Sequence, residues 1–419
     1  MRRIRVTTVL LLVLFACINT QAFSADTFKI GMITTLSGPF EFVGRTYVAG
    51  MEFAVEEQNA KGGILGKKIE LIIEDDEFKP DIAIRKARSL ISEKNINLLD
   101  GAGGSHVAIA LNKVATATKT LTINHTASAD AITGKEFSRY AFRVIFNSHN
   151  ITAALVHAMV GKPYRKFYII NQDYALGRES ARAFKELLKS RIPDAQIVGE
   201  DYHPPATKDF GPYVNKILAA KADAIFTTNY GPDFTNLVRQ ARTLGLNKDV
   251  PLLTLYGGEP YVLNQLKDEA VGLYHAQMYS MNVKTPENQA LIAKYHERHK
   301  TDKDFLTWWP YPQIGQTILG FRMVFAAIEK AGSFDTEKII KTLEGFRYES
   351  AVGSWYMRPC DHQVILPMYV GIVEGGQNPY FNGSIRPDVS FPWEGPNLIM
   401  IPADQVALPA TADYNPRCK

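Results

Sequence analysis

Hydroxyl side chains follow two predicted strands at the points where each strand ends. Ser105 closes the segment Gly101-Ala102-Gly103-Gly104-Ser105, which comes after a strand ending at Asp100 and before a helix. There its hydroxyl would lie beside free N–H groups and the positive end of the helix, which suits an anion. A simple N-cap, which serine satisfies equally well, is the alternative. Thr126-Ala127-Ser128 repeats the arrangement after Leu121–Asn124, and two such loops side by side favour an anion site.

Signatures of catalysis are mostly missing from the chain. Gly62–Lys68 lacks the spacing and the Ser/Thr of a P-loop, and Val107 stands where a nucleophile elbow needs glycine. His296 and His299 have the wrong spacing for two zinc ligands on one helix face. Glu74–Glu77 lacks the alternation of a calcium loop and is better interpreted as an exposed strand end. We therefore predict no enzyme activity, no metal and no cofactor.

The elements that must position the two hydroxyl loops alternate between strand and helix. Short apolar runs such as Phe28–Thr34 and Ile69–Glu74 are separated by segments with helical periodicity, such as Tyr47–Ala60. The alternation restarts after Asn147 and runs to about Leu255. Such a pattern predicts the α/β class, with two doubly wound lobes built on parallel sheets. In open sheets of this kind, ligands bind at the carboxyl ends of the strands.

Composition and the first 25 residues limit where the protein works. The 419 residues carry a net charge of +4, and basic residues are not interleaved with aromatics, which argues against nucleic acid. Residues 1–25 have a basic head, a short apolar run and small residues, the pattern of a secretory signal peptide. This predicts a periplasmic protein, whereas a lipid anchor at Cys17 is disfavoured because Phe15 stands where a small residue is usual.

Two cysteines remain after the signal, Cys360 and Cys418, in a compartment that permits disulfides. We predict that they bond and pin an irregular tail to the second lobe, while two free thiols remain the alternative. A metal site is less favoured because neither cysteine has a partner at CxxC spacing.

Several segments together resemble the periplasmic solute-binding proteins of branched-chain amino-acid type ABC importers. The similarity covers about Phe28–Tyr274 well and the last third loosely. The matching pieces are Lys29-Ile30-Gly31, Leu36-Ser37-Gly38-Pro39, Ala54–Ile64, Glu74-Asp75-Asp76, Asp173-Tyr174 with Gly177-Arg178, Asp209-Phe210, Tyr230-Gly231-Pro232-Asp233, and Gln240-Ala241-Arg242 with Leu244-Gly245-Leu246.

The resemblance implies two lobes joined by three crossing segments that close on a ligand. The expected division is residues 26–146 with 276–353 for the first lobe, and residues 147–275 with 354–419 for the second lobe and tail. Ser105 and Ser128 would hold a ligand carboxylate, with Ala127 contributing backbone there. Phe42 or Val43 would cover the ligand from the first lobe. Three tyrosines would face it from the second lobe, namely Tyr174, Tyr230 and Tyr256.

The resemblance also implies partners, which are the permease and ATPase subunits of an importer, and a monomeric binding protein. Amino-acid binders of the family usually place an acid near Tyr256 to receive the α-ammonium, whereas Gly257-Gly258 follows here. We therefore expect a small carboxylate ligand, an aromatic acid. Branched-chain or other aliphatic amino acids remain the alternative, with Glu259 receiving the ammonium. A ligand-sensing receptor domain of the same fold is a further alternative.

Overall fold

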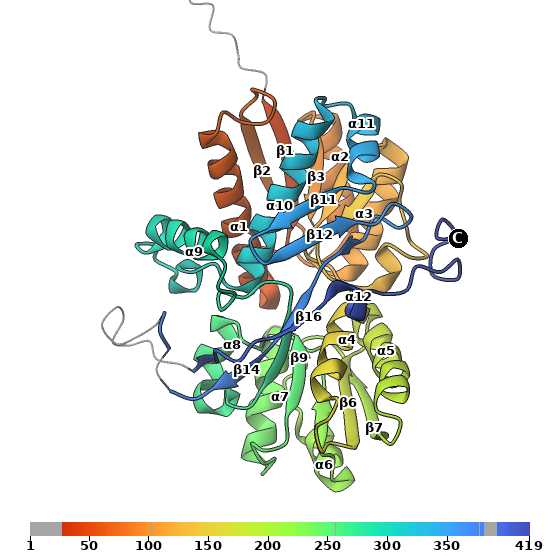
Figure 1. Cartoon of the computed structure of the whole chain (residues 1–419), viewed down its shortest axis with the longest axis vertical. Coiled ribbons are helices and arrows are strands. Elements are labelled where there is room, and N and C mark those ends of the chain that lie inside the picture. The colour runs from red at the N-terminus through yellow and green to blue at the C-terminus, as the bar shows by residue number, and fades with distance from the viewer. Residues whose placement is uncertain (1–26, 102, 256, 377, 381–391) are drawn as a thin grey trace, which may run out of the picture.

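The chain forms two lobes, each built on its own sheet (Figure 1). The computed structural model describes residues 27–101, 103–255, 257–376, 378–380 and 392–419. The predicted α/β class and the two parallel-sheet cores are confirmed. Residues 1–25, predicted to be a signal peptide and containing Cys17, lie outside the described residues.

The first lobe has a five-stranded sheet in the order β2-β1-β3-β4-β5, and all of its strand pairs are parallel. Its strands are β1 (Phe28–Thr34), β2 (Ile69–Asp75), β3 (Leu98–Gly101), β4 (Thr122–Asn124) and β5 (Ala141–Arg143). Side chains of β1 alternate between two cores, because successive residues of a strand face opposite sides of the sheet. Ile30 and Met32 belong to the larger core, and Ile33 belongs to the smaller one.

Helices cover both faces of this sheet. They are α1 (Glu41–Ala60), α2 (Pro80–Ser92), α3 (Ser105–Thr118), α10 (Pro312–Ala331) and α11 (Thr336–Leu343), with short 3-10 turns η1 (Gly38–Phe40) and η2 (Asp130–Ile132). Helices α1 and α10 pack together, and α2 packs on α3. Helix α9 (Pro286–His299) lies beside α1, where Lys294 and Arg298 form ion pairs with Glu57 and Glu56. A further short turn, η4 (Phe305–Thr307), precedes α10.

The second lobe has an eight-stranded mixed sheet. Its parallel part is β6 (Lys166–Gln172), β7 (Gln196–His203), β8 (Ala224–Phe226), β9 (Leu252–Leu255) and β10 (Tyr274–Gln277), and the antiparallel strands are β14 (Met368–Glu374), β15 (Trp393–Glu394) and β16 (Ile399–Ile401). The helices are α4 (Ser148–Met159), α5 (Ala175–Arg191), α6 (Gly211–Ala220), α7 (Gly231–Thr243), α8 (Pro260–Leu266), the turn η3 (Lys267–Ala270) and α12 (Ala403–Val406).

Before the C-terminal tail, three segments cross between the lobes, as predicted. They connect β5 to α4, β10 to α9, and β13 (Val364–Ile365) to β14. Strand β13 belongs to a small antiparallel sheet with β11 (Arg347–Ser350) and β12 (Gly353–Met357). The segment between β12 and β13 lies against the end of β5 in the first lobe, where Arg143 N donates to His362 O at 2.9 Å. The expected lobe boundary between residues 353 and 354 therefore falls inside β12, and residues 354–365 pack with the first lobe.

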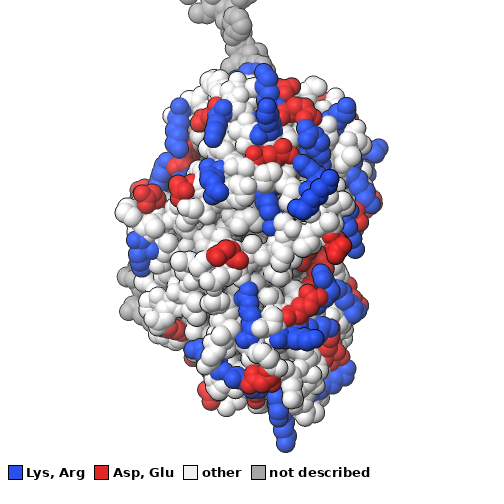
Figure 2. Space-filling model, turned by 45° about the vertical axis from the view of Figure 1, so that its right-hand side comes forward, with Lys and Arg blue, Asp and Glu red and all other residues white. Residues whose placement is uncertain are grey.

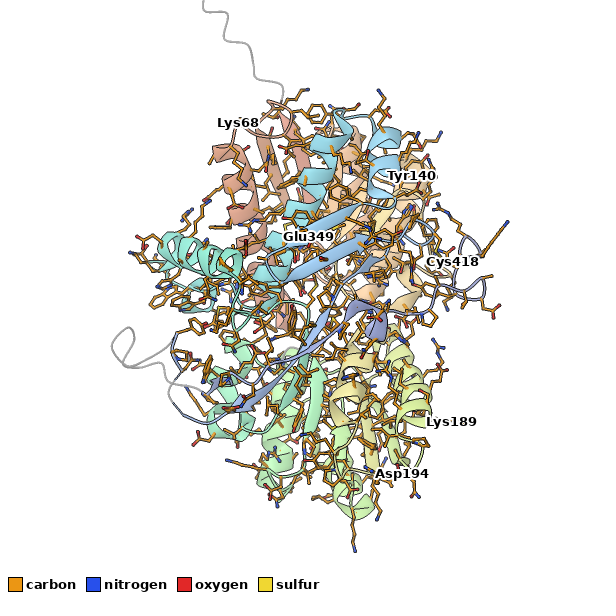
Figure 3. The ribbon with its side chains drawn as sticks, in the orientation of Figure 1. Lys68, Tyr140, Lys189, Asp194, Glu349 and Cys418 are labelled. Carbon is orange, nitrogen blue, oxygen red and sulfur yellow. A yellow bond between two sulfur atoms is a disulfide. The ribbon has the colours of Figure 1, made fainter. Side chains whose placement is uncertain are left out.

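The C-terminal tail returns to the first lobe after passing the second. Its helix α12 packs on α4, and Asn150 Nδ2 donates to Val406 O at 2.7 Å. Farther on, Asn415 Nδ2 donates to Thr133 O at 2.9 Å, and Cys418 is bonded to Cys360. Figure 3 shows Cys418 beside the first lobe, near the chain end marked in Figure 1. The disulfide therefore holds the tail to the first lobe rather than to the second, which corrects our expectation.

Charged side chains of both signs are interspersed over the face shown in Figure 2. Within the described ranges, no helix is long and apolar enough to cross a membrane.

Candidate ligand-binding site

A cavity lies between the lobes, at the carboxyl ends of the strands. It encloses about 410 Å³ of empty space, part of which is open to solvent, and we call it the inner cavity. The first lobe contributes the loops after β3 and β4 with parts of α1 and α10, and the second lobe contributes the starts of α5 and α7 and the end of β9. It is lined by Val43, Tyr47, Gly103, Gly104, Ser105, Thr126, Ala127, Ser128, Tyr174, Leu176, Tyr230, Leu255 and Gln313.

Ser105 is the first residue of α3 and lies 3 % exposed in the inner cavity. The N-cap of this helix is Gly104, and it has no side-chain cap, so Ser105 does not serve as the simple N-cap we had considered. Ser105 Oγ accepts the backbone N–H of Ala129 at 3.2 Å. This bond uses a lone pair of Ser105 Oγ but not its proton. The hydroxyl therefore remains able to donate a hydrogen bond to another acceptor.

The loop after β4 supplies Ala127 and Ser128. Asn124 Oδ1 accepts the N–H of Ala127 at 2.9 Å, and Asn124 Nδ2 donates to Ala127 O at 2.9 Å. Ala127 therefore lines the cavity with its backbone N–H bonded to Asn124, and its expected contact with the ligand stays a prediction. The Ser128 hydroxyl, in contrast, bonds to no described residue, while Ser128 O accepts the N–H of Ser148 at 2.7 Å.

Two tyrosines line the cavity from the second lobe. Tyr174 is the N-cap of α5, and Tyr230 is the N-cap of α7. Burial raises the pKa of Tyr174 well above its usual range, and the neighbouring Tyr230 hydroxyl adds to this shift. Burial also raises the pKa of Tyr230. Both phenols therefore stay neutral at physiological pH, so each presents an apolar ring with a neutral hydroxyl.

Phe42 and Tyr256 were the remaining predicted ligand contacts. Phe42 does not line the inner cavity; it borders a smaller adjoining one of about 260 Å³, together with Tyr230 and Glu259. The alternative we had named, Val43, lines the inner cavity itself. Tyr256 lies outside the described residues.

The inner cavity also contains residues that sequence reasoning missed. Tyr47 comes from α1, and Gln313 comes from the start of α10, far away along the chain. Tyr47 lies one helical turn beyond Val43, and α1 begins at Glu41 rather than at the predicted Tyr47, so the earlier start places both residues on one helix face. Nothing in the local sequence marks Gln313, because only the fold brings α10 to the cleft.

Glu259 is a buried carboxyl group in the adjoining cavity, 4 % exposed. Its Oε1 accepts the backbone N–H of Gln313 at 3.2 Å. Burial raises its pKa to about 8, because removal from water penalises the charged form. Without a cationic partner, Glu259 is therefore mostly neutral near pH 7.

Direct contacts between the lobes enclose the cavity. The rings of Phe42 and Tyr261 stack with centroids 3.8 Å apart, and Phe40 lies 5.2 Å from Tyr230. Together with the bond between Gln313 and Glu259, these contacts show the lobes closed on each other.

Comparison with known proteins agrees with this architecture. Residues 27–378 match the family model described as periplasmic binding protein. The chain belongs to the periplasmic binding protein family. It is 26 % identical over 333 residues to the Leu/Ile/Val-binding protein BraC3 of Rhizobium johnstonii, which covers 77 % of this chain and 85 % of that protein.

Two solved structures resemble this periplasmic binding protein over most of their length. One is a solute-binding protein of an ABC transporter from Rhodopseudomonas palustris, in complex with 3,4-dihydroxybenzoic acid. It is 25 % identical with a TM-score of 0.77, over 90 % of this chain and 98 % of that one. The other is an ABC transporter substrate-binding protein from Sphaerobacter thermophilus, 26 % identical with a TM-score of 0.78, over 90 % and 98 % of the two chains. The resemblance stated from the sequence is thereby confirmed, and the protein is of the ABC-transporter type.

A strained turn after β2 lies beside the cleft of this periplasmic binding protein. Glu77 and Phe78 both have left-handed backbone, with φ of 50° and 59°, and such non-glycine residues cost about 1–3 kcal/mol each. Asp76 stabilises the turn: its Oδ1 accepts the N–H of Phe78 at 2.7 Å, and its Oδ2 accepts the N–H of Gly103 at 2.8 Å. Asp76 is fully buried, so the acidic segment Glu74–Glu77 is not merely the exposed strand end that we expected.

Proposed function

We propose that this protein is the extracytoplasmic solute-binding component of an ABC importer, and that it binds a small carboxylate, an aromatic acid, in the inner cavity. It would work as a monomer in the periplasm and deliver its ligand to the permease and ATPase subunits. Its task is binding without covalent chemistry, so the proposal involves neither metal nor cofactor.

The observation that carries the proposal is the environment of Ser105. Its hydroxyl accepts from Ala129 N and is left with a proton to donate into the cavity, at the positive end of α3. Ser128 Oγ, which bonds to no described residue, adds a second hydroxyl from the neighbouring loop. Two hydroxyl donors near a helix N-terminus favour a carboxylate ligand, because hydrogen bonds to a charged acceptor are stronger than those to a neutral one.

Aromatic rings around the cavity support a flat ligand body. Tyr47, Tyr174 and Tyr230 line it, and burial raises the pKa of Tyr174 and Tyr230, so these two phenols are neutral near pH 7. Ring pairs contribute roughly 0.5–1.5 kcal/mol beyond the burial of area. The Rhodopseudomonas palustris neighbour, bound to 3,4-dihydroxybenzoic acid, is consistent with such a ligand.

An aliphatic amino acid is the second candidate, and Glu259 is the observation that favours it. Glu259 lies in the adjoining cavity, and a ligand ammonium beside it would pair with its carboxylate and lower its raised pKa. The Leu/Ile/Val-binding relative is consistent with this candidate. We favour the aromatic acid because the neutral form of Glu259 offers an ammonium no charge, and ionising it in this buried position has a free-energy cost.

Calorimetry distinguishes the two candidates. We expect 3,4-dihydroxybenzoate or benzoate to bind the purified protein, and leucine, isoleucine and valine to bind much more weakly. The Glu259→Gln variant should keep the affinity for the aromatic acid, because it removes only an ionisable group. Tight binding of the amino acids that disappears in Glu259→Gln, with no binding of the aromatic acids, would establish the second candidate instead.

A further inference from the structure

A second cavity lies outside the inner one and shares two of its side chains. This outer cavity is lined by Phe78, His106, Gln172, Tyr174, Pro205 and Tyr230, and it contains about 600 Å³ of empty space, part of it open to solvent. Tyr174 and Tyr230 also line the inner cavity, so this tyrosine pair separates the two spaces. The outer lining is mostly ring and hydrocarbon, contributed by both lobes.

The ring of Phe78 is held in place from several directions. Its centroid lies 4.9 Å from that of Phe40 and 4.7 Å from that of His106, whose Nε2 lies 3.1 Å from Phe78 O. The Asp76 carboxylate fixes the left-handed backbone beneath it. A half-buried aromatic ring that is held in this way is preorganised for contact, because little side-chain freedom remains to be lost on binding.

The opposite side of the outer cavity is built similarly. Pro205 precedes Ala206, which also has left-handed backbone, with φ of 65°. Asp233 Oδ2 accepts the N–H of Ala206 at 2.9 Å and also accepts from the side chain of Gln172. Non-glycine residues in this conformation persist where surrounding contacts enforce them, and they cluster at ligand contacts. Here they occur on both sides of one cavity, on different lobes.

We propose that the outer cavity is a second subsite, in which Phe78 and Pro205 bind an additional apolar group of the ligand beyond the tyrosine pair. This inference rests on the proposed carboxylate function and names a larger ligand class, namely carboxylic acids that carry a second ring or acyl group. The carboxylate binds at Ser105 and Ser128, and Tyr174 and Tyr230 move apart enough for the ligand to extend past them. Burial of the second group between the lobes also stabilises the closed form, since both lobes contact it.

Affinities of three monocarboxylates test the subsite, namely benzoate, benzoylglycine and biphenyl-4-carboxylate. We expect at least one of the two larger acids to bind about tenfold more tightly than benzoate, the gain expected from burying a further ring. Phe78→Ala should remove this gain and leave the affinity for benzoate unchanged. Phe78→Gly serves as a second variant, because glycine removes the ring while accepting the left-handed backbone. Phe137→Ala, a half-buried aromatic elsewhere in the first lobe, is the matched control and should keep the gain.

The outcomes separate the subsite from the carboxylate site. If benzoate binds but the larger acids bind no more tightly, the subsite is overturned and the proposed function stands. The same conclusion follows if the Phe78 variants weaken the binding of all three acids equally. If none of the three acids binds, the subsite and the proposed function are both overturned. A gain that is lost in the Phe78 variants and in Pro205→Ala, but not in Phe137→Ala, supports the subsite.

Discussion

The ring of Phe42 stacks on the ring of Tyr261 across the cleft, with centroids 3.8 Å apart and planes inclined by 10°. Phe42 lies in α1 of the first lobe, and Tyr261 lies in α8 of the second. A rotation that opens the lobes separates these rings, so the stack contributes to the closed state only. Ligand affinity then depends partly on a contact that the ligand does not make itself.

We therefore expect Phe42→Ala to weaken ligand binding by shifting the lobes towards the open form. An aromatic pair is worth roughly 0.5–1.5 kcal/mol, which corresponds to a loss of affinity of about 2- to 10-fold. Small-angle scattering should show a smaller radius of gyration on adding 3,4-dihydroxybenzoate, and the variant should need more ligand to reach it. A radius that does not change at saturation would contradict hinge closure.

Replacement of the Ser105 hydroxyl should weaken the binding of any carboxylate ligand. Ser105→Ala removes a donor to a charged group, worth about 1–3 kcal/mol, or about 5- to 150-fold in affinity. Calorimetry measures the loss. Ser92→Ala, whose hydroxyl donates to Arg88 O on the surface of α2, is the control and should bind normally. Equal affinities of the Ser105 variant and the wild type would remove Ser105 from the site.

The disulfide between Cys360 and Cys418 closes a loop with a sequence separation of 58 residues. In the chain-entropy model such a bond stabilises the folded protein by about 4 kcal/mol. The Cys360→Ser, Cys418→Ser double variant should unfold at lower denaturant concentration, with its tail more accessible to protease than in the wild type. Intact-mass analysis after alkylation without reductant should find both cysteines unmodified in the wild type, and alkylation of both would refute the bond.

Glu179 should make stability depend on pH. This α5 side chain accepts the backbone N–H of Asp130 in the first lobe, and burial followed by the neighbouring Asp130 carboxylate raises its pKa from 4.5 to about 7. The folded protein thus binds this proton more tightly than the unfolded chain. The protonated Glu179 side chain therefore adds to the free energy of unfolding. This contribution is fully present below about pH 4.5 and is lost as the pH rises to about 7.

Glu179→Gln removes this dependence, because glutamine does not ionise but still accepts the N–H. The unfolding free energy of the variant should rise relative to that of the wild type between about pH 5 and about pH 8, by at most roughly 3 kcal/mol. Glu186→Gln, on the same helix and paired with Arg182 at 3.5 Å, is the control and should follow the wild type. Parallel curves for the Glu179 variant and the wild type would contradict the shift.

Local sequence order was enough to predict the elements that carry the hydroxyls of Ser105 and Ser128. Strand–helix alternation identified β3, α3 and β4, and with them the loops of Ser105 and Ser128, because in a parallel sheet all carboxyl strand ends meet at one edge. Tyr174 and Tyr230, which the family resemblance implied, also lie beside the cavity, because each follows a strand of the second sheet. Their roles in binding remain predictions.

Tertiary structure alone decided which distant segments meet. Gln313 reaches the cleft only because α10 packs on α1, and the tail lies on the first lobe because Asn415 bonds Thr133 and Cys418 bonds Cys360. Phe78 contributes to the outer cavity because Asp76 enforces a left-handed turn that its residue types disfavour. Hydrophobic periodicity reports which residues are buried within one element, whereas these contacts depend on how separate elements and lobes pack together.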